Sequence, residues 1–227
     1  HGEDEAANVY AAIQAISSRL KEGQITVVGN GSACVVGGHA QIIKKGQRFI
    51  SNSAVASMGY DLPAAIGIWA ASRKGGAYSV GADREGEDVI LITGDGSIQM
   101  NIQELQWVKR ENIPVKMIVM NNEALGMIRH LQRDYFDCVY ADTSDGSGFS
   151  SCDFTDVAQA YGIPAKRIQG EDVEKYAGGF LEQNGPELLE IMLEHGTYAY
   201  PKTCLGEPIH NQQPYIPKPI FDELMEL

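Results

Sequence analysis

Two short polar motifs in this chain carry residues that could bind a metal ion. Gly94-Asp95-Gly96 is followed, after the 24 residues at positions 97 to 120, by Asn121-Asn122. Asp95 can offer a carboxylate oxygen and Asn122 an amide oxygen. A small hard cation such as Mg²⁺ prefers oxygen ligands, and it usually takes only a few from protein while a phosphate group supplies others. The two motifs therefore point to a metal-bridged diphosphate site.

Each motif closes an apolar run that is typical of a buried parallel strand. The runs cover residues 89–93 and 115–120. Parallel strands end at a common edge of an open α/β sheet, and such sheets bind ligands at that edge. We therefore expect Asp95 and Asn122 to lie close together. The alternative interpretation is two ordinary turns, because Gly, Asp and Asn all favour turns.

The rest of the chain alternates between strand-like and helix-like patterns, with polar loops expected at 75–88 and 142–152. The expected strands are 25–28, 48–50, 89–93, 115–120 and 187–193. One helix, capped by Asp4 and stopped by Gly23, is expected to run through Val9, Ile13, Ile16 and Leu20. Other helices are expected after Gly29–Ala33 and over 63–72, 98–109, 125–134, 154–161 and 171–183. This alternation predicts an α/β fold, a three-layer, doubly wound and mostly parallel sheet with right-handed crossovers.

Composition and charge argue against several classes of protein. The 227 residues suit one large domain, and the 44% hydrophobic content is that of a globular chain. The net charge of −12 argues against nucleic acid and against an anionic membrane surface as partners. No apolar run approaches the roughly 20 residues of a membrane helix. Since no signal peptide is visible, we expect a cytoplasmic protein whose cysteines are reduced thiols, at Cys34, Cys138, Cys152 and Cys204.

The motifs resemble the diphosphate-binding domain of thiamine diphosphate enzymes, whose signature is GDG, a spacer in the mid-twenties and NN. The stretches ASMGYDLPAAIG at 56–67 and NNEALGM at 121–127 are most similar to the acetolactate synthase group, whose members act on 2-oxoacids. The similarity extends from about residue 5 to about residue 205. It implies the thiamine diphosphate-binding fold, with a cofactor domain at 1–205 and a C-terminal tail at 206–227. Because five prolines separate short segments beyond Tyr198, we expect this tail to wrap a surface or a neighbour.

The resemblance implies thiamine diphosphate and Mg²⁺ as cofactors. Asp95 and Asn122 would bind Mg²⁺ through their side chains, and Ala124 through its main-chain carbonyl. Gly94 and Gly96 would let the backbone approach the diphosphate. Ser97, which we expect to open the next helix, would bind phosphate at the positive end of that helix, or act as a plain N-cap.

Further residues would contact the cofactor by resemblance. Met58 is similar to the apolar residue on which the cofactor bends, and the Ala56 carbonyl, next to Ser57, would accept a hydrogen bond from its amino group. Gly31-Ser32-Ala33 forms a second strand-to-helix turn, at the family's other diphosphate contact. Gly126 and Met127 would touch the pyrimidine side. The alternatives are an ordinary glycine-rich loop at the second turn and a core-filling role for Met58.

The chain has no convincing match to the glutamate that activates the cofactor in this family. That glutamate comes from a separate pyrimidine-binding domain of a neighbouring subunit, whereas Glu85 and Glu87 lie in a polar loop and Glu104 on an expected helix. We therefore expect no catalytic residue in this chain and little or no turnover by it alone. The expected partners are a pyrimidine-binding domain, a 2-oxoacid substrate and further copies in a homo-oligomer.

Three hypotheses describe the function. The first is the C-terminal cofactor domain of an acetolactate synthase-like enzyme that decarboxylates or ligates 2-oxoacids, excised from a longer protein because the chain begins at His1 without an initiator methionine. The second is a natural subunit of a split 2-oxoacid decarboxylase, and the third is a non-catalytic cofactor-binding module. Retention of Asp95, Asn122 and Met58 weighs against the third. Leu131 departs from the family's pattern, because acetolactate synthases typically place a tryptophan of the second-substrate pocket there.

Overall fold

A parallel β-sheet forms the centre of the larger part of the chain. The computed structural model describes residues 9–72, 88–196 and 198–226, and its contacts divide the chain into two units, His1–Thr197 and Tyr198–Leu227. In the first unit six parallel strands lie in the order β2-β1-β3-β4-β6-β5. Their bounds are β1 Ile25–Val28, β2 Arg48–Ile50, β3 Val89–Gly94, β4 Val115–Asn121, β5 Ala165–Gln169 and β6 Glu187–Met192.

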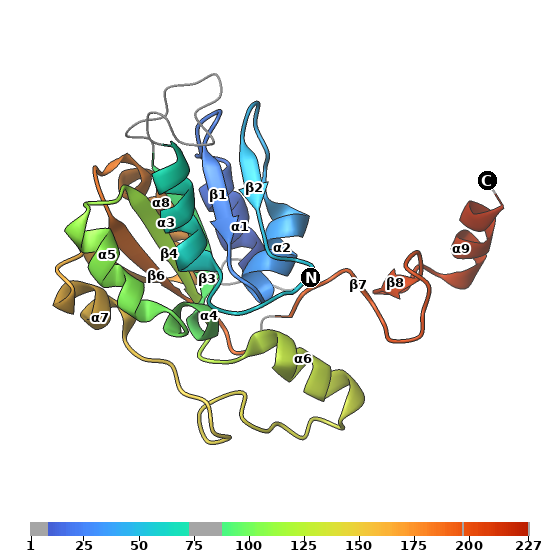
Figure 1. Cartoon of the computed structure of the whole chain (residues 1–227). Helices are drawn as coiled ribbons and strands as arrows, with labels where there is room; N and C mark the ends of the chain where they lie inside the picture. The colour runs from blue at the N-terminus through green and yellow to red at the C-terminus, as the bar shows by residue number, and fades with distance from the viewer. Residues whose placement is uncertain (1–8, 73–87, 197, 227) are drawn as a thin grey trace. The chain divides into compact units, whose positions relative to one another are not determined.

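Helices cover both faces of this sheet (Figure 1). One layer contains α1, which contacts both α2 and α8, and the other contains α3, α5 and α7. Alternate strand residues point to opposite faces, so Leu91, Met117 and Val119 join the buried cluster beneath the second layer. The predicted three-layer α/β fold is confirmed. The helices are α1 Val9–Ser17, α2 Ser32–Ala40, α3 Asp61–Ser72, α5 Leu105–Arg110, α7 Phe154–Ala160 and α8 Val173–Glu182.

The two central strands bring the polar motifs together at one edge of the sheet. β3 and β4 are buried along almost their whole length because strands and helices flank them on every side. Their register sets Gly94 opposite Met120, so Asp95, which follows β3, lies near Asn121 at the end of β4 and Asn122 directly after it. Two helices, α4 Asp95–Gln99 and α6 Gly126–Tyr135, begin at the same edge. This edge is where the sequence places the site.

All five predicted strands are confirmed, but one strand was missed. β5 has the sequence AKRIQ, and only Ile168 of it is buried, because β5 pairs with β6 alone at the margin of the sheet. The predicted helices after Gly29–Ala33 and over 63–72, 125–134, 154–161 and 171–183 nearly coincide with α2, α3, α6, α7 and α8. The expected cap Asp4 and nearly all of the expected loop at 75–88 lie outside the described residues.

The helix predicted over 98–109 is wrong in its bounds. It begins inside the glycine motif as α4, stops at Gln99 and resumes as η2 Ile102–Glu104 and α5. The interruption has a tertiary cause, because Asn101 leaves the helical conformation and its Nδ2 donates to the Gly59 carbonyl at 2.6 Å. Ser97 therefore neither opens nor caps the helix. Its Oγ instead accepts from the Gly59 backbone N–H at 3.0 Å.

The loop predicted at 142–152 contains no helix or named strand, as expected. One isolated bridge between Ala124 and Ser144 and a hydrogen bond from Leu125 N to Thr143 O at 2.9 Å fix its first part beside the Asn121-Asn122 motif. In the second unit, β7 Lys202–Thr203 pairs antiparallel with β8 Gln212–Gln213, and α9 Lys218–Met225 has no buried residue.

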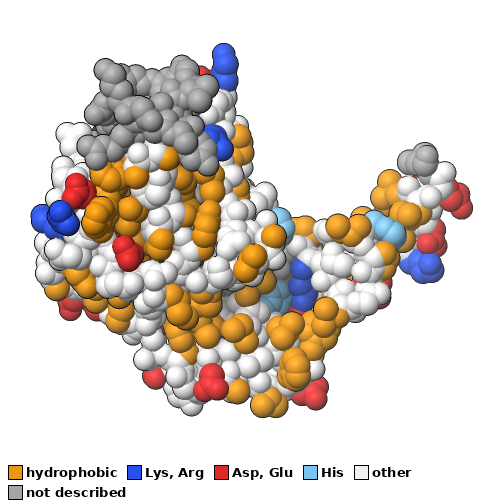
Figure 2. Space-filling model, viewed as in Figure 1, with side chains coloured by type: hydrophobic (Ala, Val, Ile, Leu, Met, Phe, Trp, Pro, Cys, Tyr) orange, Lys and Arg blue, Asp and Glu red, His pale blue; other side chains and the backbone are white. Residues whose placement is uncertain are grey.

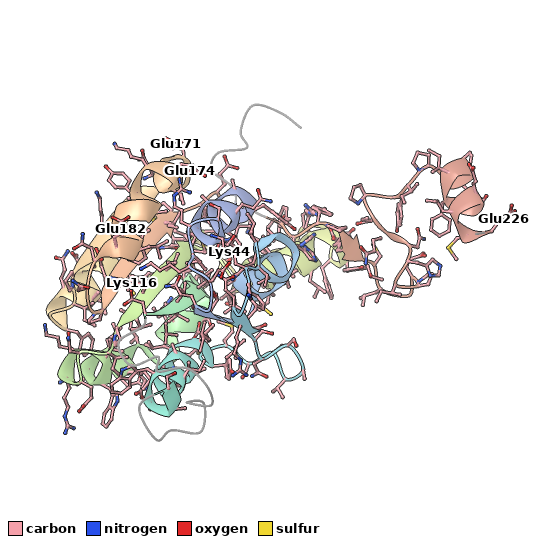
Figure 3. All side chains as sticks on the ribbon, turned by 90° about the horizontal axis from the view of Figure 1, so that it is seen from above. Lys44, Lys116, Glu171, Glu174, Glu182 and Glu226 are labelled. Atoms are coloured by element: carbon pink, nitrogen blue, oxygen red, sulfur yellow. The ribbon has the colours of Figure 1, made fainter. Side chains whose placement is uncertain are left out.

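Charged side chains divide between the surface and the interior. Glu171, Glu174 and Glu182, from η3 Gly170–Asp172 and α8, are exposed, whereas Lys116 of β4 lies inside the fold (Figure 3). Nζ of Lys116 donates to the Gly185 carbonyl at 3.1 Å and faces Oε2 of Glu187 at 3.5 Å. These partners offset the cost of burying the ammonium group.

Candidate cofactor site

A cavity of about 130 Å³ lies at the carboxyl edge of the sheet, where β1, β3 and β4 end and α2, α4 and α6 begin. Twelve of the residues that the sequence assigns to the cofactor line this one cavity. They are Gly31, Ser32, Ala33, Met58, Gly94, Asp95, Gly96, Ser97, Asn122, Ala124, Gly126 and Met127. The structure thus brings together three turns that lie far apart in the sequence.

Asp95 joins the two polar motifs directly. It is 3% exposed, and its Oδ1 accepts from the Gly96 backbone N–H at 2.8 Å. Its Oδ2 accepts from the Ala124 backbone N–H at 3.1 Å, across the gap between the ends of β3 and β4. The carboxylate is therefore fixed in orientation while it remains on the wall of the cavity.

The electrostatic environment of Asp95 suits a cation. Burial raises the pKa of Asp95 to about 7, although the N–H groups of Gly96 and Ala124 act in the opposite direction. Among the described residues, no lysine, arginine or histidine forms an ion pair with this carboxylate. A buried carboxylate without a cationic side chain gains most from a bound metal ion, which would hold it in the ionised form.

Asn122 and Ala124 line the cavity beside Asp95, and the Ala124 carbonyl accepts from the Gly126 backbone N–H at 2.8 Å. Asn122 is 7% exposed, and within the described part of the chain its amide makes no hydrogen bond. Glu123 between them has a positive φ of 52°, an uncommon conformation for a residue with a side chain. No cluster of three His, Cys, Asp or Glu side chains that could hold a metal exists among the described residues. The residues present therefore fit a metal that takes further oxygens from a phosphate ligand.

The sequence of this chain is similar to those of known proteins. Residues 29–191 match the family described as thiamine pyrophosphate enzyme, C-terminal TPP binding domain. The chain belongs to this family. The resemblance to the cofactor domain of acetolactate synthase-like enzymes is also confirmed, because the relatives found include several acetolactate synthases.

Three such relatives illustrate the similarity of this thiamine pyrophosphate-binding domain. It is 34% identical over 156 residues to the large subunit of acetolactate synthase isozyme 2 of Escherichia coli (strain K12). The aligned region covers 68% of this chain and 26% of the relative. It is 31% identical over 200 residues to chloroplastic acetolactate synthase 2 of Zea mays, covering 86% and 30%. It is 33% identical over 191 residues to chloroplastic acetolactate synthase 2 of Nicotiana tabacum, covering 78% and 27%. The matched region thus spans less than a third of each relative.

Two glycines of this TPP-binding domain lie in close contact with side chains that line the cavity. A Cβ on Gly96 would lie 2.6 Å from Cδ2 of Leu125 and 2.8 Å from Cε of Met58. A Cβ on Gly126 would lie 2.9 Å from Nδ2 of Asn122. A side chain at either position would therefore push the ends of Leu125, Met58 or Asn122, which line the cavity.

Ala56 and Ser57 are the two predicted cofactor residues that do not line the cavity. Both are exposed, Ala56 has a positive φ of 54°, and Oγ of Ser57 accepts from Nδ2 of Asn52 at 2.8 Å. They directly precede Met58, which does line the cavity, so the backbone turns from the surface into the cavity at that residue.

Sequence reasoning missed six cavity residues. Two of them follow strand ends and could have been found from the rule that ligands bind at the carboxyl edge, namely Asn30 after β1 and Leu193 after β6. Val9 comes from α1, and no local pattern in the sequence marks it as a cavity residue. The other three are Met120, Leu125 and Ile128.

The helix beside the cavity exposes apolar side chains. Ile128, Leu131 and Tyr135 of α6 are 46%, 43% and 40% exposed, and Figure 2 shows hydrophobic surface over this helix at the lower edge of the view. Ile128 also lines the cavity, so the exposed surface is continuous with the site.

Glu104 lies in η2 and is not a cavity residue, while Glu85 and Glu87 fall outside the described residues. Among the described helices, none is long and apolar enough to cross a membrane.

Proposed function

We propose that this TPP-binding domain holds thiamine diphosphate through Mg²⁺ at the carboxyl edge of its sheet, as the cofactor half of an acetolactate synthase-like enzyme that acts on a 2-oxoacid. One observation carries the proposal. The buried carboxylate of Asp95 is hydrogen-bonded to Ala124 and lines the same cavity as Asn122, whose amide makes no hydrogen bond to the described residues.

In this proposal each oxygen has a defined role. The Asp95 carboxylate, the Asn122 amide oxygen and the Ala124 carbonyl bind Mg²⁺, while backbone N–H groups at the starts of α2 and α4 face the diphosphate. Asp95 cannot rotate away, because both its oxygens already accept from backbone N–H groups. Bound thiamine diphosphate supplies the electron sink for cleaving or forming the carbon–carbon bond next to the carbonyl of a 2-oxoacid.

The remaining cavity residues orient the organic part of the cofactor. Met58, Leu125 and Met127 form an apolar wall that excludes water from it. Gly31-Ser32-Ala33 and Gly126 also line the cavity, and because their side chains are small or absent they leave space for the cofactor. Ala56 and Ser57 would contact only those atoms of the cofactor that extend beyond the cavity.

The proposal leaves half of the active site to a partner. No described glutamate lines the cavity, so we propose that a pyrimidine-binding domain, in the same polypeptide or in a separate subunit, supplies the activating carboxylate. The exposed apolar residues of α6 support this, because such a surface beside a cofactor cavity is suited to cover by a partner. We expect little or no turnover from this chain alone, and decarboxylation of a 2-oxoacid by the chain with added cofactor would contradict that expectation.

Calorimetric titration with thiamine diphosphate tests the binding function. We expect binding with Mg²⁺ and none when the metal is removed by a chelator. Asp95→Ala should abolish it, whereas Asp156→Ala, a change at an exposed acidic residue of α7, should leave it unchanged. Metal-dependent binding that survives Asp95→Ala would show that the metal ligands are assigned wrongly. Absence of binding by the unaltered protein in its full natural length would favour a module that has lost the cofactor.

A further inference from the structure

A series of hydrogen-bonded polar side chains leads from β5 to the turn that carries Asn122. Nε of Arg167 donates to Oε2 of Glu190 at 2.9 Å, and Nδ2 of Asn121 donates to Oε1 of Glu190 at 2.6 Å. Oδ1 of Asn121 in turn accepts from the backbone N–H of Glu123 at 2.9 Å. None of these four residues lines the cavity, yet the series ends in the middle of the proposed metal turn.

Glu190 is a charged residue in the interior of the sheet. Its side chain is 0% exposed on β6, and Arg167 lies directly opposite it on β5. The guanidinium of Arg167 also forms an ion pair with Asp153, the N-cap of α7, at 2.9 Å. A buried ion pair is often no more stabilising than apolar residues of similar size, so its presence points to a role in fixing a conformation.

The carboxylate of Glu190 determines which way the amide of Asn121 faces. Because Glu190 offers only acceptors, Nδ2 of Asn121 must point toward it, and Oδ1 then points toward the N–H of Glu123. Oγ of Ser151 donates to the same Oδ1 at 3.3 Å and favours the same orientation. If the amide turned over, its NH₂ group would face that N–H and the hydrogen bond would be lost. Glu190 is thus linked to the turn by geometry, although it does not touch it.

The turn that follows depends on this hydrogen bond. Glu123 adopts a positive φ of 52°, which a residue with a side chain rarely keeps without support. Asn121 supports it from one side, and the bond from Ala124 N to Oδ2 of Asp95 at 3.1 Å supports it from the other. This conformation sets where the Asn122 side chain and the Ala124 carbonyl lie.

We propose that Glu190, held by Arg167, is a positioning residue for the metal turn and acts through Asn121. It keeps the turn in the conformation that presents Asn122 and Ala124 to Mg²⁺ before the metal arrives. This inference rests on the proposed function and deepens it, because it assigns part of the metal affinity to a buried residue of β6 that does not line the cavity.

Glu190→Gln tests the proposal with little change in volume. Glutamine has one acceptor and one donor, so its NH₂ group must face either Arg167 or Asn121, both of which are donors. We expect the Mg²⁺ concentration for half-maximal thiamine diphosphate binding to rise at least about tenfold, as for other residues that orient metal ligands. The measurement is calorimetric titration of the protein in its full natural length.

Glu187→Gln is the matched control. It makes the same change on the same strand, also beside a buried cation, because Glu187 faces Lys116 at 3.5 Å near the opposite end of β6. We expect it to shift the Mg²⁺ requirement less than about twofold, since it does not touch the turn. An equal shift in the two variants, at equal loss of thermal stability, would overturn the proposal.

Asn121→Ala provides an independent route if Glu190→Gln does not fold. It removes the link to the turn and leaves the Glu190–Arg167 pair in place, so it should raise the Mg²⁺ requirement by a similar factor. Adding Glu190→Gln to Asn121→Ala should raise it no further, because Glu190 acts through Asn121. Wild-type Mg²⁺ dependence in Asn121→Ala, or a double variant whose effects add, would overturn the proposal.

The outcomes separate this inference from the proposed function. If thiamine diphosphate binds with Mg²⁺, Asp95→Ala abolishes binding and Glu190→Gln matches the wild type, only the inference about Glu190 is wrong. If the wild type shows no metal-dependent binding, or if Asp95→Ala retains it, the proposed function is wrong and the role of Glu190 is contradicted with it.

Discussion

Asp95 should make the stability of this protein depend on pH in a way that Asp95→Asn removes. Burial raises the pKa of Asp95 from 3.8 to about 7 in the folded state. Because the folded protein then holds this proton more tightly than the unfolded chain, the contribution of Asp95 to stability is most favourable at low pH and falls as pH rises from about 4 to about 7. Such a change in pKa corresponds to about 4 kcal/mol once the folded carboxylate has ionised.

Asparagine cannot ionise, so it escapes this loss. The free energy of unfolding of Asp95→Asn, minus that of the wild type, should increase by about 2–3 kcal/mol between about pH 5 and about pH 8. The amide nitrogen of asparagine must also face one of two backbone N–H donors, on Gly96 or Ala124, at a cost of about 1–3 kcal/mol. That cost does not vary with pH, so it cancels when the two conditions are compared.

Urea unfolding without metal or cofactor, followed by the fluorescence of Trp69 and Trp107, measures both free energies at each pH. Asp156→Asn on the surface of α7 is the control, and its difference from the wild type should stay within about 0.5 kcal/mol at both pH values. If the Asp95→Asn difference is the same at both pH values, burial does not control the ionisation of Asp95 and the reasoning is refuted.

Four further substitutions probe the cavity, an exposed helical position and the interior. Gly96→Ala should lower the free energy of unfolding by about 1–3 kcal/mol in urea titrations and weaken cofactor binding, because its Cβ would lie 2.6 Å from Leu125. Gly38 lies in α2, and a Cβ at this position would have no other atom within 4 Å. Gly38→Ala should therefore stabilise the protein by up to about 1 kcal/mol and leave cofactor binding unchanged. A loss of stability in Gly38→Ala would contradict the view that the cost at Gly96 comes from its close contacts. Lys116→Met should change stability by less than about 1.5 kcal/mol, whereas Lys116→Ala should cost about 2–4 kcal/mol by leaving a void, and equal effects of the two would argue against packing as the cause.

The central part of the fold follows from local sequence. Apart from Thr93 and Lys116, the runs before Gly94 and Asn121 are apolar and rich in β-branched residues, which is typical of strands with two covered faces. Polar residues that favour turns end both runs. The adjacency of Asp95 and Ala124 then follows from strand order alone. That is why the two motifs could be placed together without the structure.

The errors have tertiary causes. β5 has one buried residue, so nothing in its composition distinguishes it from a loop. The break after Gln99 arises because Asn101 hydrogen-bonds to Gly59, a contact between residues 42 positions apart in sequence. The role of Glu190 cannot be predicted from the sequence, because its partners Asn121 and Arg167 lie on two other strands. Pairing across strands is invisible to a pattern read along one strand.

The most direct test of the account is a crystal structure of the protein with thiamine diphosphate and Mn²⁺ in place of Mg²⁺, located by its anomalous scattering. The account predicts one metal at the carboxyl edge of the sheet, bound at about 2.1 Å by the Asp95 carboxylate, the Asn122 amide oxygen and the Ala124 carbonyl, with diphosphate oxygens as further ligands. A metal bound elsewhere, or a diphosphate held in this cavity without a metal at Asp95, would contradict it.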